Sequence, residues 1–454
     1  MNDKINLINN DCLKVLKTIS ENSIDSIITD PPYALTPKSY EENSFSGGFM
    51  GHEWDKNLVS VDIWKECFRV LKSGSYAFIM CSPRQDVLGK TIFNLKEAGF
   101  NMNFSSIYWA YSTGMPKAMN LAKAVDKKLG IKRKVIGKKI VDKEIQSRSL
   151  YAGQKSKLVE IEETIATSKQ AKIMDGWYAG YQPKPALEII ITCQKPLKHN
   201  SYVEQSIDYA NQIINRKKTN INNGGTNLDK CRIPVENTLQ KEKTSANPKG
   251  RFPSNLLISN NILDKGVVTK SIGGKSGHNE AYSGAFKESY YNNTKPGYND
   301  SGDFSRYNNL DIWFNKKIKE LPPEIQKTFP FLIVPKPSKS EKSKGCKNIS
   351  KTRKCKWNNA GKWQNLETEQ YGNVHPTTKP IKLMSYLITL GSRKDDVILD
   401  PFMGSGTTGI ACILLERKFI GIELNKEYFE IAERRIGYEK INKEGILAFL
   451  KRRD

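Results

Sequence analysis

The sequence lacks any run of apolar residues long enough to cross a membrane, for which roughly 18 residues or more are needed. Its N-terminus lacks the apolar core of a signal peptide, and no internal repeat is visible. These absences exclude membrane-spanning, exported and repeat architectures. We therefore expect a cytoplasmic protein without a membrane partner, whose 454 residues suffice for two domains that each hold a core.

Paired cysteines are missing as well. The eight cysteines are scattered without a Cys-x-x-Cys pair, and Cys346 and Cys355 have neither metal-ligand spacing nor histidine neighbours. This distribution argues against a zinc site, and free thiols in a reducing compartment are the default. We expect no bound metal. No nuclease or helicase motif is evident, so cleavage or translocation of a nucleic acid would need another chain.

Acidic residues are few relative to basic ones: 48 Asp and Glu face 72 Lys and Arg, which gives a formal net charge of +24. The dense phosphates of duplex DNA suit such a surface. Lysine is also abundant where a coding sequence favours A and T, so part of the excess can be a solvated background. The clusters are more informative than the total, and several lie in the middle of the chain, at Lys127-Lys128, Lys132 to Lys134, Arg216 to Lys218 and Lys339 to Lys356.

Among the residues that are present, Asp30-Pro31-Pro32-Tyr33 follows the apolar run Ile24 to Thr29. Consecutive prolines hold a short extended segment open and leave their carbonyls free, because proline has no N–H and a fixed φ. An exocyclic amino group of a base would donate to Asp30 and to the Pro31 carbonyl, while Tyr33 offers a ring for stacking. An ordinary proline-rich turn is the alternative interpretation.

A second motif joins a buried strand to a helix through a glycine turn. The apolar residues that end at Asp400 run through Pro401 into Phe402-Met403-Gly404-Ser405-Gly406-Thr407, and Glu423 ends the next apolar run. Glycines let a backbone approach a ligand closely, and a carboxylate after the following strand suits ribose hydroxyls.

The spacing Gly404-x-Gly406-x-x-Gly409 also satisfies the dinucleotide-binding pattern, so a nicotinamide or flavin oxidoreductase is an alternative. Two features count against it. Asp400 would repel a pyrophosphate, and only about thirty residues follow Glu423, roughly one βαβ unit. A cationic or zwitterionic ligand fits Asp400 better.

Strands alternate with helices near both chain ends, which indicates a parallel α/β sheet assembled from both. The C-terminal piece is too short to complete a sheet, and the N-terminus supplies the missing strands. The Asp30 turn and the Asp400 turn then both lie at the carboxyl ends of strands, where open α/β sheets bind ligands. We expect strands over residues 5–8, 24–29, 76–81, 104–110, 186–192, 395–400 and 419–422, and helices from residue 10 and over 61–71, 84–98, 381–390, 405–416 and 426–435.

In these motifs the chain resembles the β class of S-adenosylmethionine-dependent amino-group DNA methyltransferases, in which the catalytic motif precedes the cofactor motif. The resemblance is carried by Asn10-Asp11-Cys12, Asp30 to Tyr33, His375 to Pro380 and Asp400 to Thr407, in the order and spacing of the family. It covers roughly residues 4–125, 184–197 and 372–440. It implies a Rossmann-like methyltransferase sheet with an inserted target-recognition domain.

The resemblance also implies roles for individual residues. Asp30, Pro31, Pro32 and Tyr33 would be catalytic. Asp400 and the turn at Gly404 and Gly406 would hold the methionine part of S-adenosylmethionine, and Thr378 to Pro380 would close the cofactor pocket from the other side. Glu423 would take the ribose hydroxyls and Asp11 the adenine amino group, although Asp11 also suits a helix cap. The residues assigned to the cofactor are Asp11, Thr378, Lys379, Pro380, Asp400, Pro401, Phe402, Gly404, Ser405, Gly406, Thr407 and Glu423.

The target base would have to leave the duplex, because its amino group cannot be reached inside it. Residues 34–56, with three glycines, suggest a loop over the flipped base, although an ordinary surface loop is equally compatible. In the resembled family Asp at the first tetrapeptide position goes mostly with adenine N6 and Ser with cytosine N4. We therefore favour N6 of adenine, with N4 of cytosine as the alternative.

The domains expected are a first catalytic part over 1–125, an insertion with the target-recognition domain over 126–371, and a second catalytic part over 372–454. A strand near 184–197 returns from the insertion to the sheet. Within the insertion we expect a helix near residues 159–167 and a structural role for Trp177, Trp313, Trp357 and Trp363 in a core or interface. Which insertion residues read bases cannot be derived from sequence.

The expected partner is double-stranded DNA, in a nucleoid-associated protein. The resemblance leaves room for a homodimer and for a restriction enzyme encoded separately. A non-catalytic DNA-binding protein would explain the charge alone, but it would leave the glycine turn without a role. Affinity for the cofactor separates that alternative from the methyltransferase.

Overall fold

The computed structural model describes residues 4–34, 57–110, 117–142, 158–182, 187–215, 217–234, 250–258, 269–271, 274–275, 294–295, 300–302, 309–319, 339–346, 350–357, 363–371, 373, 375 and 377–451. The chain divides into two compact units, Met1–Tyr111 with Leu187–Asp454, and Ser112–Ala186. The first unit therefore joins the two chain ends, as the sequence predicts. None of the helices in the described ranges combines the length and hydrophobicity of a transmembrane segment.

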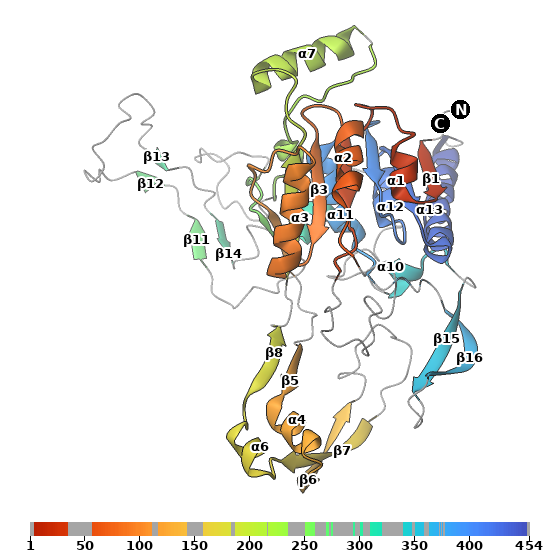
Figure 1. Cartoon of the computed structure of the whole chain (residues 1–454). Helices are drawn as coiled ribbons and strands as arrows, with labels where there is room; N and C mark the ends of the chain where they lie inside the picture. Colours follow the sequence, from red (N-terminus) through yellow and green to blue (C-terminus); the bar gives the residue numbers. More distant parts are fainter. Residues whose placement is uncertain are drawn as a thin grey trace. The chain divides into compact units, whose positions relative to one another are not determined.

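The first unit is built on one eight-stranded sheet (Figure 1). Five neighbouring strands are parallel, β9 runs antiparallel between β3 and β4, and β10 is parallel to β4. The strands in spatial order are β1 (Ile5–Asn9), β18 (Lys418–Glu423), β17 (Val397–Asp400), β2 (Ser26–Thr29), β3 (Tyr76–Cys81), β9 (Leu187–Gln194), β4 (Ile107–Ala110) and β10 (Leu256–Ile258). The α/β fold assembled from both chain ends is confirmed, including the strand that returns from the insertion.

Helices cover both faces of this sheet, because alternate residues of the central strands point to opposite sides. Ala77, Ile79 and Cys81 of β3 belong to one apolar cluster, while Phe78 and Met80 belong to the other. The first cluster packs under α1 (Cys12–Leu16), α2 (Val61–Val70) and α3 (Gln85–Glu97), and the second under α11 (Ile381–Gly391), α12 (Thr407–Leu414) and α13 (Lys426–Lys451).

The second unit holds a small mixed structure around Asp126, whose side chain is fully buried. Asp126 accepts hydrogen bonds from Ser168 and Thr167 and pairs with Arg133 at 2.9 Å. These bonds to the carboxylate lower the pKa of Asp126, the Ser168 hydroxyl contributing most. The elements are β5 (Lys117–Asn120), α4 (Leu121–Lys128), β6 (Lys134–Asp142), β7 (Leu158–Ile165), α6 (Lys169–Ile173) and β8 (Tyr178–Gln182).

One expectation for this region is wrong, and a second is wrong in part. Residues 159–167 are not helical: β7 occupies most of them and pairs antiparallel with β6. Its sequence alternates Val, Ile and Thr with Glu, and pairing with a distant strand outweighs the helix propensity of the glutamates. Trp177 does not lie in a core, since 66% of its surface is exposed, and the alternative role at an interface stays a prediction.

The rest of the insertion belongs to the first unit. Trp313 of α8 is 1% exposed, as a core residue should be, and its ring lies edge-on to Tyr386 at 5.0 Å. The side chains of Trp357 and Trp363 lie outside the described residues. The remaining elements are α7 (Tyr202–Ile214), the 3-10 helix η3 (Leu228–Cys231), β11 (Thr269–Ser271), β12 (Gly274–Lys275), β13 (Thr294–Lys295), β14 (Asp300–Gly302), α8 (Leu310–Lys319), α10 (Lys339–Ser343), β15 (Ser350–Trp357) and β16 (Trp363–Tyr371).

Candidate functional site

The carboxyl ends of four adjacent parallel strands bring together residues from both chain ends. The strands lie in the order β1, β18, β17 and β2. Asp11 follows β1, Glu423 ends β18, Asp400 ends β17 and Asp30 follows β2. The register places Asn9 opposite Glu423 and Asp400 opposite Gly421. Since ligands of open α/β sheets bind at this edge, the expected cofactor residues and the expected catalytic residue share one binding edge.

Asp400 lies deepest, with 2% of its surface exposed. The Thr29 hydroxyl donates to its Oδ1 at 2.6 Å, and the Thr408 hydroxyl donates to its Oδ2 at the same distance. Burial raises the pKa of Asp400 to about 6, against the lowering effect of the two hydroxyls. The carboxylate is therefore held inside the protein and ties β2 to β17 and α12.

The turn after β17 needs glycine at two positions. Gly404 has φ +54° and Gly406 has φ +79°, a region that other residues rarely adopt. A Cβ on Gly404 would lie 2.7 Å from the His375 ring, and a Cβ on Gly406 would lie 3.1 Å from the Cα of Ala432. His375 in turn contacts the Tyr428 ring at 4.5 Å between centroids. The turn is thus closely packed on its inner side.

The segment before α11 closes against this turn, as expected for Thr378, Lys379 and Pro380, all of which are buried. The Thr378 hydroxyl lies 3.1 Å from the Ser405 hydroxyl. Arg435 of α13 is 1% exposed and donates to the hydroxyls of Ser405 and Thr407 at 3.1 and 3.2 Å. Burial lowers the pKa of Arg435 to about 10. These hydroxyls hold the turn in place.

Glu423 and Asp11 lie at the other side of the turn. Glu423 is half-buried, and its two oxygens accept the backbone N–H groups of Gly404 and Asn425, each at 2.8 Å. Burial raises the pKa of Glu423. Asp11 is also half-buried and accepts the N–H of Lys14 at 3.0 Å, so it caps α1. Asp11 thus has the helix-capping role that the sequence suggests. The second carboxylate oxygen of Asp11 still suits an amino group.

The tetrapeptide follows β2 directly. Asp30 accepts the Tyr33 hydroxyl on Oδ1 at 2.5 Å, and Lys379 donates to Oδ2. The Lys379 Nζ also lies 3.4 Å from Glu188 Oε2 in β9. Burial, Asp30 and Glu188 all raise the pKa of Tyr33, burial contributing most. The carboxylate expected to receive an amino group therefore already accepts one hydroxyl and one ammonium group.

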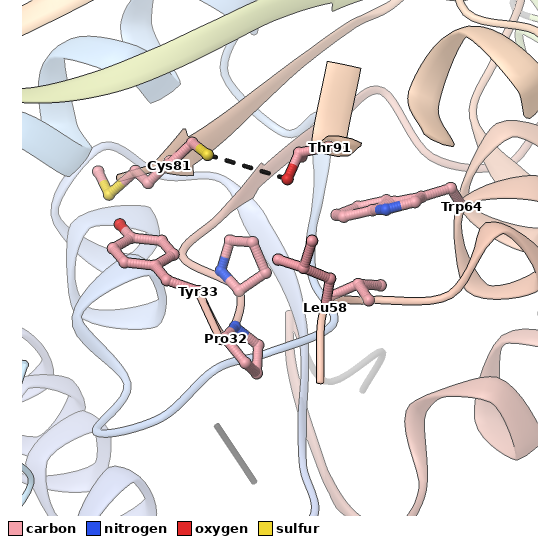
Figure 2. Close-up of a pocket in the computed structure, with 9 residues that line it drawn as sticks. Pro32, Tyr33, Leu58, Trp64, Cys81 and Thr91 are labelled. Carbon is pink, nitrogen blue, oxygen red and sulfur yellow. Dashed lines mark hydrogen bonds between the residues drawn. The ribbon is translucent and has the colours of Figure 1, made fainter. Parts of the chain in front are cut away.

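A small pocket opens beside the tetrapeptide, as Figure 2 shows. Pro32 and Tyr33 form one side of it, and Trp64 and Leu58 lie opposite (Figure 2). The remaining lining is also mostly apolar, and the volume of about 10 Å³ is room for one water molecule. Residues 35–56, expected to cover a flipped base, lie outside the described residues.

Several residues of the site were not identified from the sequence: Thr29, Thr408, Glu188 and Arg435. The first two are hydroxyl groups that reveal their role only when Asp400 is placed between them. Glu188 did leave a signal, because it is the single acidic residue in the apolar strand Leu187–Gln194. The sequence gives no such signal for Arg435, since an arginine in a helix with many charged residues is common.

The arrangement fits a cationic or zwitterionic ligand. Five carboxylates lie at or near this edge: Asp11, Asp30, Glu188, Asp400 and Glu423. Among the described residues, Lys379 lies beside Asp30 and Glu188 and donates to Asp30, while Arg435 donates to the hydroxyls of the glycine turn. A dinucleotide pyrophosphate would meet net repulsion here, which counts against the oxidoreductase alternative. Within the described ranges, no group of three or more His, Cys, Asp or Glu could hold a metal ion.

Comparison with known proteins agrees with these motifs. The model of a family described as DNA methylase matches residues 24–434. A type II methyltransferase of Moraxella bovis, M2.MboI, is 49% identical over 75 residues, which are 16% of this chain and 26% of that protein. The DNA adenine methyltransferase YhdJ of Escherichia coli (strain K12) is 44% identical over 85 residues, 19% of this chain and 29% of that protein.

The chain thus spans between a quarter and a third of the length of these two relatives. Among solved structures, the complex of M1.HpyAVI with SAM aligns over 95% of this chain and 98% of that one, with a TM-score of 0.36 and 16% identity.

Proposed function

The chain belongs to the N6/N4 DNA methylase family, and from that premise we propose that it transfers a methyl group from S-adenosylmethionine to the N6 amino group of an adenine flipped out of double-stranded DNA. The observation that carries the proposal is the hydrogen bond from Thr29 to Asp400. It ties the strand that ends at the tetrapeptide to the strand that ends at the glycine turn. A methyl acceptor and a methyl donor bound at these two turns would be neighbours.

Asp30 and the Pro31 carbonyl would receive the two hydrogens of the target amino group. This amine is a weak nucleophile, because its lone pair is delocalised into the ring. Hydrogen bonds from both hydrogens favour a more tetrahedral nitrogen and aim its lone pair away from the ring. The nitrogen gains the methyl group and loses one proton, which Asp30 or water accepts. Most of the rate enhancement then comes from proximity and orientation.

Bound S-adenosylmethionine would supply an electrophilic methyl group on a positively charged sulfur. Glu423 suits its ribose hydroxyls, since the carboxylate has about four lone pairs and the backbone N–H groups of Gly404 and Asn425 use one on each oxygen. Asp11 lies across the β1–β18 pair from Glu423 and suits the adenine amino group. Asp400 is buried, so we propose that its negative charge stabilises the sulfonium from beneath without contacting the cofactor.

Adenine is preferred to cytosine for two reasons. The tetrapeptide begins with Asp, which in this family goes mostly with adenine N6. The matched relatives include one named as a DNA adenine methyltransferase. The Tyr33 ring would stack on the flipped base, and stacking of this kind is worth about 1–3 kcal/mol per base.

The target-recognition function is assigned to the insertion, residues 126–371, together with the start of the unit Ser112–Ala186. Exposed lysines in that unit, such as Lys127, Lys128 and Lys132, would contact phosphates. A DNA substrate implies a protein located at the nucleoid. The names of several relatives as type II methyltransferases support a restriction enzyme on a separate chain as the functional partner.

The proposal is tested by following labelled methyl transfer from S-adenosylmethionine to duplex DNA. The parent protein should label DNA, and Asp30→Ala should lose transfer while its cofactor affinity by calorimetry stays within about twofold of the parent. Equal transfer by parent and variant would remove Asp30 from the mechanism. Absence of both cofactor binding and transfer in the parent would refute the methyltransferase assignment.

A further inference from the structure

Lys379 is held between two carboxylates that come from different strands. It donates to Oδ2 of Asp30 after β2, and its Nζ lies 3.4 Å from Oε2 of Glu188 in β9. The side chains are 8% exposed for Lys379, 18% for Asp30 and 15% for Glu188. The catalytic motif Asp30 to Tyr33 accounts for Asp30, but it does not explain why a second carboxylate reaches the same ammonium group.

The charges of this cluster matter because the groups are buried. Two carboxylates and one ammonium give a net charge of −1. Burial alone would lower the pKa of Lys379, but Asp30 and Glu188 raise it above its usual value, so the ammonium persists at neutral pH. A buried ammonium that lost its only carboxylate partner would be strongly unfavourable.

Asp30 has one established donor on each oxygen, since Oδ1 accepts the Tyr33 hydroxyl at 2.5 Å. An amino group that donates to Oδ2 therefore meets the Lys379 ammonium there, and the two donors share the charge of one oxygen. Lys379 can yield this oxygen only if another acceptor is within a short displacement of its Nζ. Glu188 is placed to be that acceptor.

We propose that Glu188 is a positioning residue for methyl transfer, which receives the Lys379 ammonium when the amino group of the target base takes Oδ2 of Asp30. The inference rests on the proposed function. In the exchange, Lys379 stays paired, Asp30 becomes an acceptor for the base, and the net charge of the cluster stays at −1. That charge is opposite to the single positive charge of a sulfonium methyl donor.

Two single variants and their combination test the exchange. Glu188→Gln leaves Lys379 bound to Asp30, so the KM for DNA should rise about tenfold and the single-turnover rate should fall, while cofactor affinity changes less than about twofold. Lys379→Met leaves two carboxylates facing each other, so its single-turnover rate should also fall by about tenfold or more.

The double variant Glu188→Gln/Lys379→Met tests whether the cluster charge controls the reaction. It restores the net charge of −1, which Asp30 then carries alone. It should methylate at least about fivefold faster than either single variant, a positive interaction between adjacent sites. If the two losses instead multiply, Glu188 and Lys379 act only through the fold and the inference is overturned. A parent protein that transfers no methyl group overturns the proposed function and this inference with it.

Two controls separate the exchange from folding. Glu188→Asp keeps the negative charge and should stay within about threefold of the parent in KM for DNA, whereas a value as high as that of Glu188→Gln contradicts the charge argument. Glu416→Gln breaks a 2.6 Å ion pair between Glu416, which precedes β18, and Lys394, which precedes β17, at the opposite end of these strands from the site. It should leave both kinetic constants unchanged. Thermal unfolding of every variant checks that each is folded.

Discussion

Tyr33 shows how the structure changes the interpretation of a residue. From the sequence its ring is a stacking surface, yet its hydroxyl also donates to Asp30 at 2.5 Å. A hydrogen bond to a charged group is worth about 1.5–3 kcal/mol. The hydroxyl therefore fixes the orientation of the carboxylate that the reaction uses, in addition to any stacking by the ring.

Substitution of Tyr33 separates these two contributions. Tyr33→Phe should lower the single-turnover rate about tenfold through loss of the hydroxyl, and Tyr33→Ala should lower it by about a further tenfold through loss of stacking. Rapid-quench measurement with saturating cofactor reports both. A phenylalanine variant as fast as the parent would show that the bond to Asp30 has no part in the reaction.

Asp400 gives a prediction for stability against pH. Its pKa is about 6 in the folded protein and near 3.8 in an unfolded chain, so the native state binds the proton more tightly. The contribution of this group to stability is thus fully present below pH 3.8 and is lost as the pH rises through 6. The shift of roughly two units corresponds to about 3 kcal/mol.

Asp400→Asn removes this titration. Relative to the parent, the free energy of unfolding of the variant should increase by up to about 3 kcal/mol between about pH 4 and pH 8. Urea unfolding of both proteins at several pH values gives the difference, in which other titrating groups largely cancel. A difference that does not vary with pH would mean that Asp400 has an ordinary pKa.

At the scale of elements, the glycine turn between β17 and α12 is the most constrained connection of the site. Gly406→Ala would place a Cβ 2.9 Å from Ile436 and 3.1 Å from the Cα of Ala432, at φ +79°. We expect a loss of about 2 kcal/mol or more in stability together with weaker cofactor binding. Calorimetry and chemical unfolding measure the two effects.

Gly89→Ala is the matched control. Gly89 lies inside α3, and a Cβ there meets nothing within 4 Å. Alanine is a better helix former than glycine by about 1 kcal/mol, so this variant should be as stable as the parent or slightly more so. Equal effects of the two substitutions would show that the turn has no special geometry.

The elements also show what a sequence can predict. Buried strands bounded by turns, such as Tyr76–Cys81 and Leu187–Gln194, were predicted to within two residues, because short apolar runs leave few alternatives. β7 was assigned to a helix, because its partner β6 is a non-local feature. α13 continues to Lys451, beyond the expected end at residue 435, because Gly437 weakens a helix but, unlike proline, still donates its backbone N–H.

The same distinction applies to the site. The Asp30 and Asp400 turns are predicted to lie together, because the carboxyl ends of parallel strands share one edge. Glu423 ends the strand after the glycine turn, and Asp11 joins the site only through the family resemblance. The partners of Asp30 and Asp400 are not predicted, since the bonds from Thr29 to Asp400 and from Lys379 to Asp30 join residues more than 300 positions apart. Only the assembled sheet brings those residues together.

For the molecule as a whole, the net charge of +24 predicts salt-dependent binding to DNA. Counterion release should weaken the affinity on the order of a thousandfold between about 50 and 200 mM salt. Fluorescence anisotropy with a labelled duplex gives the slope, and cofactor affinity over the same range serves as the control, because it should change little. A flat dependence for DNA would remove phosphate contacts as the source of affinity.

The most direct test of the central claim is nucleoside mass spectrometry of DNA from a methylation-deficient host that expresses this chain. We predict N6-methyladenine with the parent protein and none with Asp30→Ala. N4-methylcytosine in its place would contradict the choice of base. The absence of either modified nucleoside, with folded protein and cofactor present, would contradict the methyltransferase account itself.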